Sequence, residues 1–148
     1  MKIAYLLHLN LGPNSGVFKK IVAQSNLWKE MGHQIGIFVF TREDDVYKKI
    51  TAYKGHFDIE CEVYENYPKL FPLSRFKAIN NVVKKVYRYA PDIVYTRRDL
   101  YYPQLRKMAK DFPLVIEVNS NEIIELKHYS LGQYIYHVLT RRLLDNNV

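Results

Sequence analysis

The pattern of apolar and polar residues near the start of the chain predicts a strand, a loop, a helix and a second strand. The chain opens with a short apolar run, MKIAYLLH, and Asn10–Gly16 follows with several turn-forming residues. From Val17 the apolar residues recur at helical spacing until Gly32, a common end signal. Gln34–Phe40 is again continuously apolar, as is typical of a parallel strand buried on both faces. These elements predict one right-handed crossover unit.

The middle of the chain predicts an edge strand and a long helix. Phe57–Tyr64 alternates between apolar and polar residues, so we expect a strand with one wet face near a sheet edge. We expect Thr41–Lys49 to be a loop with a short helix, and Pro68 and Pro72 to close a linker. The next helix is expected to turn Phe76, Ile79, Val83, Val86 and Ala90 inward and Lys77, Asn81, Lys84, Lys85 and Arg88 outward.

The last third of the chain predicts two further strands and two further helices. Ile93–Thr96 and Leu114–Val118 are apolar runs of strand length, and Leu100–Asp111 between them has helical spacing. A final helix is expected from Ser130. The residues expected to face inward are Tyr101, Leu105 and Met108 in the first of these helices, and Tyr134, Ile135, Val138 and Leu139 in the second.

This alternation of strands and helices predicts an α/β fold. We expect a doubly wound, mostly parallel, Rossmann-like sheet of about five strands, formed by a single domain over residues 1–148. In such a sheet a helix at this position is normally followed by another strand. Either the chain is a fragment, truncated before the last strands of the fold, or the fold is a minimal five-stranded one, and we expect the truncation.

The composition indicates in which compartment the protein is found and what charge its partners carry. The single cysteine, Cys61, cannot form an internal disulfide and is expected to be a small core residue, which favours a reducing, cytoplasmic compartment. No run approaches the roughly 18 apolar residues that a membrane span needs. The net charge of +7 favours anionic neighbours, namely phosphates, nucleic acid or an acidic lipid surface.

Ligands of open parallel sheets bind at the carboxyl ends of the strands, which brings three predicted loops together. The first loop carries Gly12, Asn14, Ser15 and Gly16 and ends at a helix amino terminus, which suits a phosphate or carboxylate. The alternative is that the glycines permit a tight turn while Asn14 or Ser15 caps the helix. Neither a dinucleotide fingerprint nor a Walker loop is present.

The other two loops add candidate side chains. Arg97 and Arg98 could clamp a phosphate or carboxylate, or one of them could pair with Asp99 or a helix end. His8, at the end of the first strand, is a candidate for lining the site, and Asn119–Glu122 forms the third loop. No Cys/His cluster has the spacing of a metal site, so we predict no metal.

The order of several motifs resembles the family 4 glycosyltransferases. The residues that carry the resemblance are MKIAY at the start, Ser15-Gly16-Val17 opening a helix, MGHQI before a strand, APDIVYTR ending at Arg97, and VIEVN ending at Asn119. The resemblance covers most of the chain and is to the amino-terminal, acceptor-side domain of a two-domain GT-B enzyme. Where the family usually has Gly-Gly before the valine, this chain has Ser15-Gly16.

The resemblance implies a retaining, hexosyltransferase-like enzyme that moves a sugar from a nucleotide-sugar to a glycan or lipid-linked acceptor, as in the synthesis of cell-envelope polysaccharide. The donor would bind mainly to a second domain, absent from this chain, so the isolated domain is expected to be inactive. The loop with Gly16 would approach the donor's phosphates, and no general base is assigned. The acceptor side would be lined by His8, Arg97, Arg98, Asn119, Asn121 and Glu122.

One further spacing resembles a signature of that family. Glu117 and Glu125 have the spacing of the family's Glu-x7-Glu signature, but Glu117 falls in a predicted buried strand, so we interpret the spacing as chance.

The alternative function is a stand-alone module that docks on an anionic membrane, at the inner face of the cell membrane. Its basic surface would be Lys77, Lys84, Lys85 and Arg88, which could equally be a solvated helix face. Nucleic acid is not expected as a partner, because the basic residues are spread over several helices and no reading motif is present.

Overall fold

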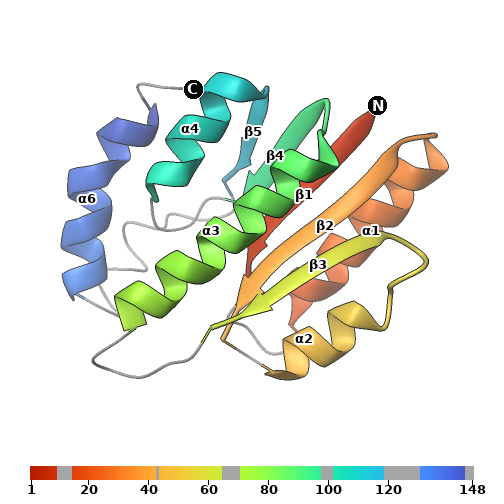
Figure 1. The fold of residues 1–148 in the computed structure, drawn as a ribbon, viewed down its shortest axis with the longest axis horizontal. Helices are drawn as coiled ribbons and strands as arrows, with labels where there is room; N and C mark the ends of the chain where they lie inside the picture. The colour runs from red at the N-terminus through yellow and green to blue at the C-terminus, as the bar shows by residue number, and fades with distance from the viewer. Residues whose placement is uncertain (10–14, 43, 65–70, 98–101, 119–130, 146–148) are drawn as a thin grey trace.

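The sheet of the protein has five parallel strands. A computed structural model describes residues 1–9, 15–42, 44–64, 71–97, 102–118 and 131–145 (Figure 1). The strands lie in the order β3-β2-β1-β4-β5 and every neighbouring pair is parallel, which confirms the predicted fold class. Their bounds are β1 Lys2–His8, β2 Gln34–Thr41, β3 Asp58–Val63, β4 Ile93–Arg97 and β5 Leu114–Glu117.

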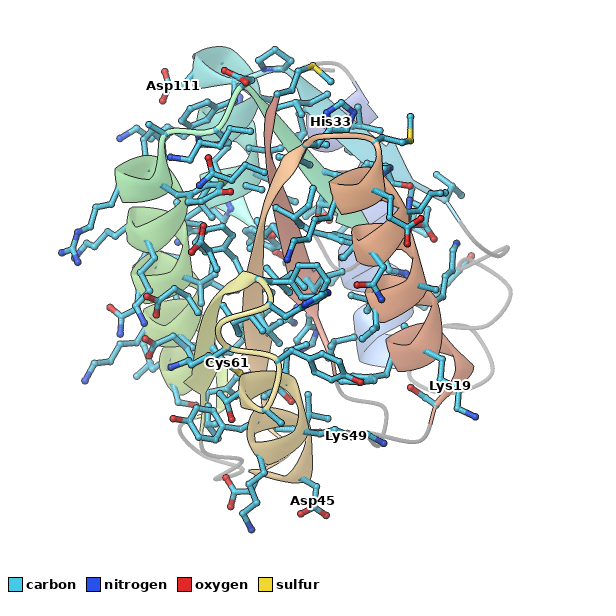
Figure 2. The ribbon with its side chains drawn as sticks, turned by 90° about the vertical axis from the view of Figure 1, so that its right-hand side faces the viewer. Lys19, His33, Asp45, Lys49, Cys61 and Asp111 are labelled. Carbon is cyan, nitrogen blue, oxygen red and sulfur yellow. The ribbon has the colours of Figure 1, made fainter. Side chains whose placement is uncertain are left out.

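Helices cover the two faces of this sheet. On one face lie α1 (Gly16–Glu30) and α2 (Asp44–Thr51), and on the other lie α3 (Phe71–Tyr89) and α4 (Pro103–Asp111). Figure 2 looks along the sheet and shows α3 and α1 on opposite sides of it. The last described helix, α6 (Leu131–Asp145), contacts α4. Among the described residues, none of the helices has the length and apolar character that a bilayer span requires.

The strand patterns explain why the sheet is buried on both sides. Successive side chains of a strand point to opposite faces. In β1, Ala4 and Leu6 pack with the α3 and α4 face, while Ile3, Tyr5 and Leu7 pack with the α1 and α2 face. β3 lies at the sheet edge as predicted, and the half-buried Cys61 packs against the α1 and α2 core. Burial, and next the charge of Glu62, raise the pKa of the Cys61 thiol to about 12.

The inward stripe of α3 differs from the prediction. The buried residues of its inner face are Ala78, Ile79, Val82, Val83 and Val86, whereas Phe76 is 47% exposed and Ala90 lies beyond the helix end at φ 49°. At about 100° per residue, Phe76 points within about 20° of the buried Val83, so periodicity places it at the edge of the buried stripe, and its exposure depends on what packs beside it. Pro72 was expected in a linker, but it lies in the first turn of α3, where proline is tolerated.

The inward face predicted for α6 is also wrong. Ile135, Val138 and Leu139 are 49%, 45% and 71% exposed, and Tyr134 is half-buried. The reason is physical: helical periodicity marks an apolar stripe but does not show whether another element covers it. In the shorter helix α4, by contrast, Leu105 and Met108 are buried as predicted, and Tyr101 lies outside the described residues.

Candidate functional site at the carboxyl edge of the sheet

The strand order reverses between β1 and β4, which are neighbours in the sheet. From β1 the chain passes through α1 to β2 on one face, and from β4 it passes through α4 to β5 on the other. In such sheets the carboxyl ends of two adjacent strands whose following helices lie on opposite faces are the usual ligand position, and we call this position the crevice. The end of β1 is fixed there, because the Leu9 amide donates to Phe40 O at 3.2 Å and the Leu9 carbonyl accepts from the Thr41 hydroxyl.

Only part of the predicted site lies among the described residues. His8, Ser15, Gly16 and Arg97 are described there. The remaining predicted loop residues lie outside the described part of the chain, namely Gly12, Asn14, Arg98, Asn119, Asn121 and Glu122.

Ser15 and Gly16 begin α1 beside the crevice. The Ser15 hydroxyl accepts from the Phe18 amide at 3.3 Å, so this side chain is the cap of the helix, which was the alternative role considered for it. Gly16 is exposed, and a Cβ added to it would have no atom within 4 Å. Among the described residues no contact therefore requires glycine at position 16, and they leave the space above it open.

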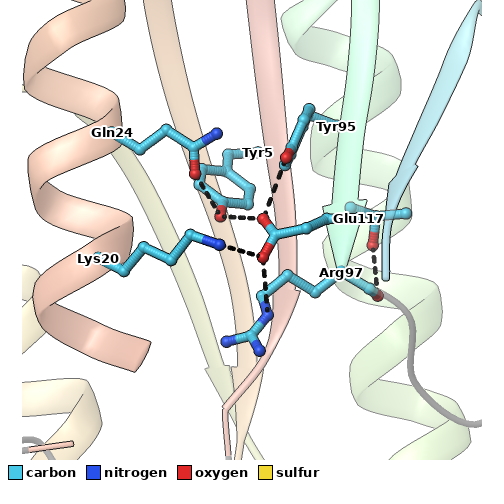
Figure 3. A network of polar contacts seen from close by, with 7 residues as sticks. Tyr5, Lys20, Gln24, Tyr95, Arg97 and Glu117 are labelled. Carbon is cyan, nitrogen blue, oxygen red and sulfur yellow. Dashed lines mark hydrogen bonds and ion pairs between the residues drawn. The ribbon is translucent and has the colours of Figure 1, made fainter. Parts of the chain in front are cut away.

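A carboxylate at the end of β5 is the centre of a polar cluster (Figure 3). The side chain of Glu117 is only 9% exposed. Its Oε1 accepts from Lys20 Nζ at 2.6 Å and lies 3.7 Å from Arg97 Nε, while its Oε2 accepts from Tyr95 Oη at 3.0 Å. Three elements, α1, β4 and β5, are thus joined through one carboxylate at the carboxyl edge.

Two further side chains complete this group. Tyr5 Oη lies 3.2 Å from Gln24 Oε1 and 3.5 Å from Glu117 Oε2, so its hydroxyl can donate to either acceptor. We call Tyr5, Lys20, Gln24, Tyr95, Arg97 and Glu117 the carboxyl-edge cluster.

The electrostatics of the cluster keep its phenols protonated. Burial, and next the Glu117 charge, raise the pKa of Tyr5, and burial also raises the pKa of Tyr95, whose hydrogen bond to Glu117 acts in the same direction. Both phenols are therefore hydrogen-bond donors at neutral pH. The outer side of the cluster is Lys20, whose side chain is 50% exposed. The arrangement can donate to an anionic group through Lys20 and Arg97, and can accept from a hydroxyl through Glu117.

His8 does not belong to this cluster. In β1, Tyr5 points to the α1 face, and His8, three residues later, points to the opposite face. There His8 Nε2 lies 2.6 Å from Tyr64 Oη, and the ring stacks on Phe40 at a centroid distance of 4.6 Å. The structure thus places two predicted acceptor-side residues, His8 and Arg97, on different faces of the sheet.

The basic surface of α3 is smaller than predicted. Lys77, Lys84 and Arg88 are exposed, but Lys85 is not a free outward cation. Its Nζ lies 2.9 Å from Glu60 Oε2 and 2.7 Å from Glu62 Oε1 on β3. Burial lowers the pKa of Lys85, but its hydrogen bonds to these two carboxylates outweigh the burial and raise the pKa overall. Lys85 therefore ties α3 to the edge strand.

Reasoning from sequence missed Glu117 as a site residue. It was assigned to a buried strand, and its spacing to Glu125 was interpreted as chance; Glu125 lies outside the described residues. A signal was nevertheless present: a carboxylate that ends an apolar strand needs a cationic or donor partner, because burying an unpaired charge is costly. Arg97 at the end of the neighbouring strand is one such partner, so the pairing alternative for this arginine holds, with Glu117 in place of Asp99.

Within the described part of the chain, no group of three or more His, Cys, Asp or Glu residues is arranged to hold a metal ion. No family model matches the chain, and neither does any curated protein or solved structure. The fold and the carboxyl-edge cluster are therefore the basis on which a function is proposed.

Proposed function

We propose that the chain is the acceptor-side, amino-terminal domain of a retaining GT-B glycosyltransferase. The carboxyl-edge cluster supports this most directly, because Glu117, Lys20 and Arg97 meet beside the crevice between β1 and β4. The strand order and the sequence motifs of family 4 described above agree with the proposal. A sugar acceptor presents hydroxyl groups, and a lipid-linked acceptor adds phosphate, so this mixture of acceptor and donor groups suits both.

In the proposed reaction, a hydroxyl of the acceptor attacks the anomeric carbon of the donor sugar on the face from which the leaving group departs, as retention requires. The bond from that carbon to the nucleotide's phosphate oxygen breaks, and the nucleoside diphosphate leaves with the proton of the attacking hydroxyl. Glu117 accepts a hydrogen bond from an acceptor hydroxyl, and Lys20 and Arg97 hold the Glu117 carboxylate in place. Glu117 is thus a positioning group for the acceptor.

The donor is expected to bind mainly to a second domain. A crevice with one wall excludes little water and offers few oriented dipoles, so residues 1–148 alone should give little rate acceleration. The open space above Gly16, beside the amino end of α1, is where the donor's phosphates are proposed to approach.

The test uses the polypeptide as its own gene produces it, purified through an affinity tag. Release of nucleoside diphosphate is measured with a panel of nucleotide-sugars and with glycan and lipid extracts of the same cells. We expect turnover by the native polypeptide and none above background by residues 1–148. The mass of the native polypeptide should be about 35–45 kDa, as two domains of ordinary size require. Robust turnover by residues 1–148 alone would refute the proposal.

A second candidate function, docking on an anionic membrane, is favoured by one observation. Leu73 and Phe76 are 68% and 47% exposed near the start of α3, beside the exposed Lys77. Exposed apolar residues next to cations are suited to the interface of an acidic bilayer. Sedimentation with vesicles of phosphatidylglycerol should pull the protein down at low salt, and vesicles of phosphatidylcholine should not. A protein that stays in solution with both kinds of vesicle is no membrane-docking module.

A further inference from the structure

A groove between α3 and α4 lies on the face of the sheet opposite the carboxyl-edge cluster. Its volume is about 380 Å³, which is within the range of about 300–1,000 Å³ typical of small-molecule sites. The residues that matter for its chemistry are Asn80, Lys84, Tyr87 and Arg88 from α3 and Gln104 and Lys107 from α4. The groove is too small for a folded partner but can hold a compact ligand.

The charge of this groove is of one sign. Lys84, Arg88 and Lys107 are its charged lining residues, and all three are exposed. Neither Lys84 nor Arg88 has an ion-pair partner among the described residues. The carboxylate of Asp111 lies nearby, but it accepts from Tyr87 Oη at 2.5 Å. The groove therefore offers cationic donors to an anion.

A second, independent feature is a buried acceptor among the lining residues. Gln104 Nε2 donates to Asn80 Oδ1 at 2.6 Å, which fixes the orientation of the Gln104 amide. Gln104 Oε1 is buried and has no hydrogen-bond partner within the described part of the chain. Buried polar atoms are normally hydrogen-bonded, so we expect this oxygen to accept from a donor outside the described residues. The phosphate of a monoester is mostly doubly ionised at neutral pH and has no proton to donate, so the donor that fits is a hydroxyl group elsewhere in the ligand.

One aromatic side chain also lines the groove. The Tyr87 ring lines it, and Lys107 Nζ lies 5.5 Å from the centre of that ring, so the cation is held at the groove. Burial, and next the hydrogen bond to Asp111, raise the pKa of Tyr87 to about 12, so the phenol remains neutral. A carbon skeleton can pack against this ring while its polar groups reach the cations and the amide.

We propose that this groove binds a hydroxylated phosphate ester, that is, a polyol or sugar phosphate. The phosphate oxygens accept from Lys84, Lys107 and Arg88, and a hydroxyl of the ligand donates to Gln104 Oε1. A free polyol phosphate and the headgroup of a lipid such as phosphatidylinositol present the same chemistry. The proposal does not depend on glycosyl transfer, because the groove shares no residue with the carboxyl-edge cluster.

The experiment measures binding to the whole chain by two-dimensional ¹H–¹⁵N NMR. The probes are myo-inositol 1-phosphate, methyl phosphate and uncharged myo-inositol, and the vesicle arm compares phosphatidylinositol with phosphatidylcholine by co-sedimentation. Two variants perturb the groove: the double change K84Q/K107Q removes two cations, and Q104L removes the acceptor. The matched control is K48Q/K110Q, which removes two exposed lysines outside the groove, on α2 and α4.

Saturable shifts of the groove residues with myo-inositol 1-phosphate support the proposal with a free ligand as the source. Saturable binding only to phosphatidylinositol vesicles supports it with a lipid headgroup as the source. In either case K84Q/K107Q should weaken binding at least about tenfold, Q104L about threefold or more, and K48Q/K110Q less than about twofold, since one charged hydrogen bond is worth about tenfold.

Three results would overturn the proposal. The first is the absence of saturable binding in both arms, and the second is an equal loss in K48Q/K110Q and K84Q/K107Q, which would indicate general charge attraction. The third is binding of methyl phosphate as tight as that of myo-inositol 1-phosphate, which would leave Gln104 Oε1 without a role. Thermal unfolding of each variant guards against misfolding, because these lysines are exposed and their loss should leave the melting temperature unchanged.

Discussion

Gly36 in β2 gives a sharp test of how the fold is packed. A Cβ added at Gly36 would lie 2.7 Å from Phe38 Cε2 and 2.8 Å from Tyr89 Cζ. Carbon atoms in contact are normally about 3.5–4.0 Å apart, so each ring would have to move by roughly 0.8 Å or more. Phe38 is 1% exposed and its ring lies 5.3 Å from that of Tyr89. Such overpacking typically costs about 1–3 kcal/mol.

We therefore expect Gly36→Ala to lower the free energy of unfolding by about 1–3 kcal/mol, measured by urea denaturation followed by circular dichroism. Gly16→Ala is the matched control, because nothing lies within 4 Å of an added Cβ there and the residue is helical. That control should be neutral or stabilising by up to about 1 kcal/mol. A Gly36→Ala protein within about 0.5 kcal/mol of the wild type would refute the packing described between β2 and the end of α3.

Three further predictions concern the cluster, the cap and the response to pH. Glu117→Gln should lower the free energy of unfolding by about 1–3 kcal/mol, because it weakens the contacts of a nearly buried carboxylate. Glu60→Gln removes the charge of an exposed carboxylate and should cost less than about 1 kcal/mol by the same urea titration. Ser15→Ala should cost about 0.5–2 kcal/mol by loss of the α1 cap, and equal stability of the two proteins would argue against that cap. The free energy of unfolding should fall as the pH rises through and beyond about 9–10, because folding raises the pKa of Cys61 and of Tyr87 to about 12. In that pH range the folded protein keeps two protons that the unfolded chain releases. A free energy of unfolding that stays constant between about pH 7 and 10.5 would contradict this.

Much of the fold could be predicted because strand and helix periods are local signals. The continuous apolar runs of β1 and β2, the alternation of β3 and the stop at Gly32, which has φ 84°, were all visible along the chain. The exposed faces of α3 and α6 were not predictable in the same way. Whether Phe76 or Leu139 is covered depends on which other element packs there, and periodicity carries no information about that.

The shared edge of the strand ends could be predicted, but the contacts made there could not. Any parallel sheet puts the carboxyl ends of its strands at one edge, so the loops after them could be grouped from the sequence. That this edge binds a ligand stays a prediction. The side of the sheet to which each residue points was the missing information, and it separates His8 from Arg97. Pairings over long sequence distances, such as Lys20 with Glu117 or Lys85 with Glu62, appear only once the strands are aligned in space.

The central claim is that the carboxyl-edge cluster positions the acceptor of a glycosyl transfer. The most direct measurement is the steady-state release of nucleoside diphosphate by the native polypeptide, compared among the wild type, Glu117→Gln and Glu60→Gln at a temperature where all three are folded. The account predicts that Glu117→Gln lowers kcat/KM about tenfold or more, as loss of one oriented hydrogen bond would, and that Glu60→Gln stays within about twofold. Unchanged turnover in Glu117→Gln, or an equal loss in both variants, would contradict it.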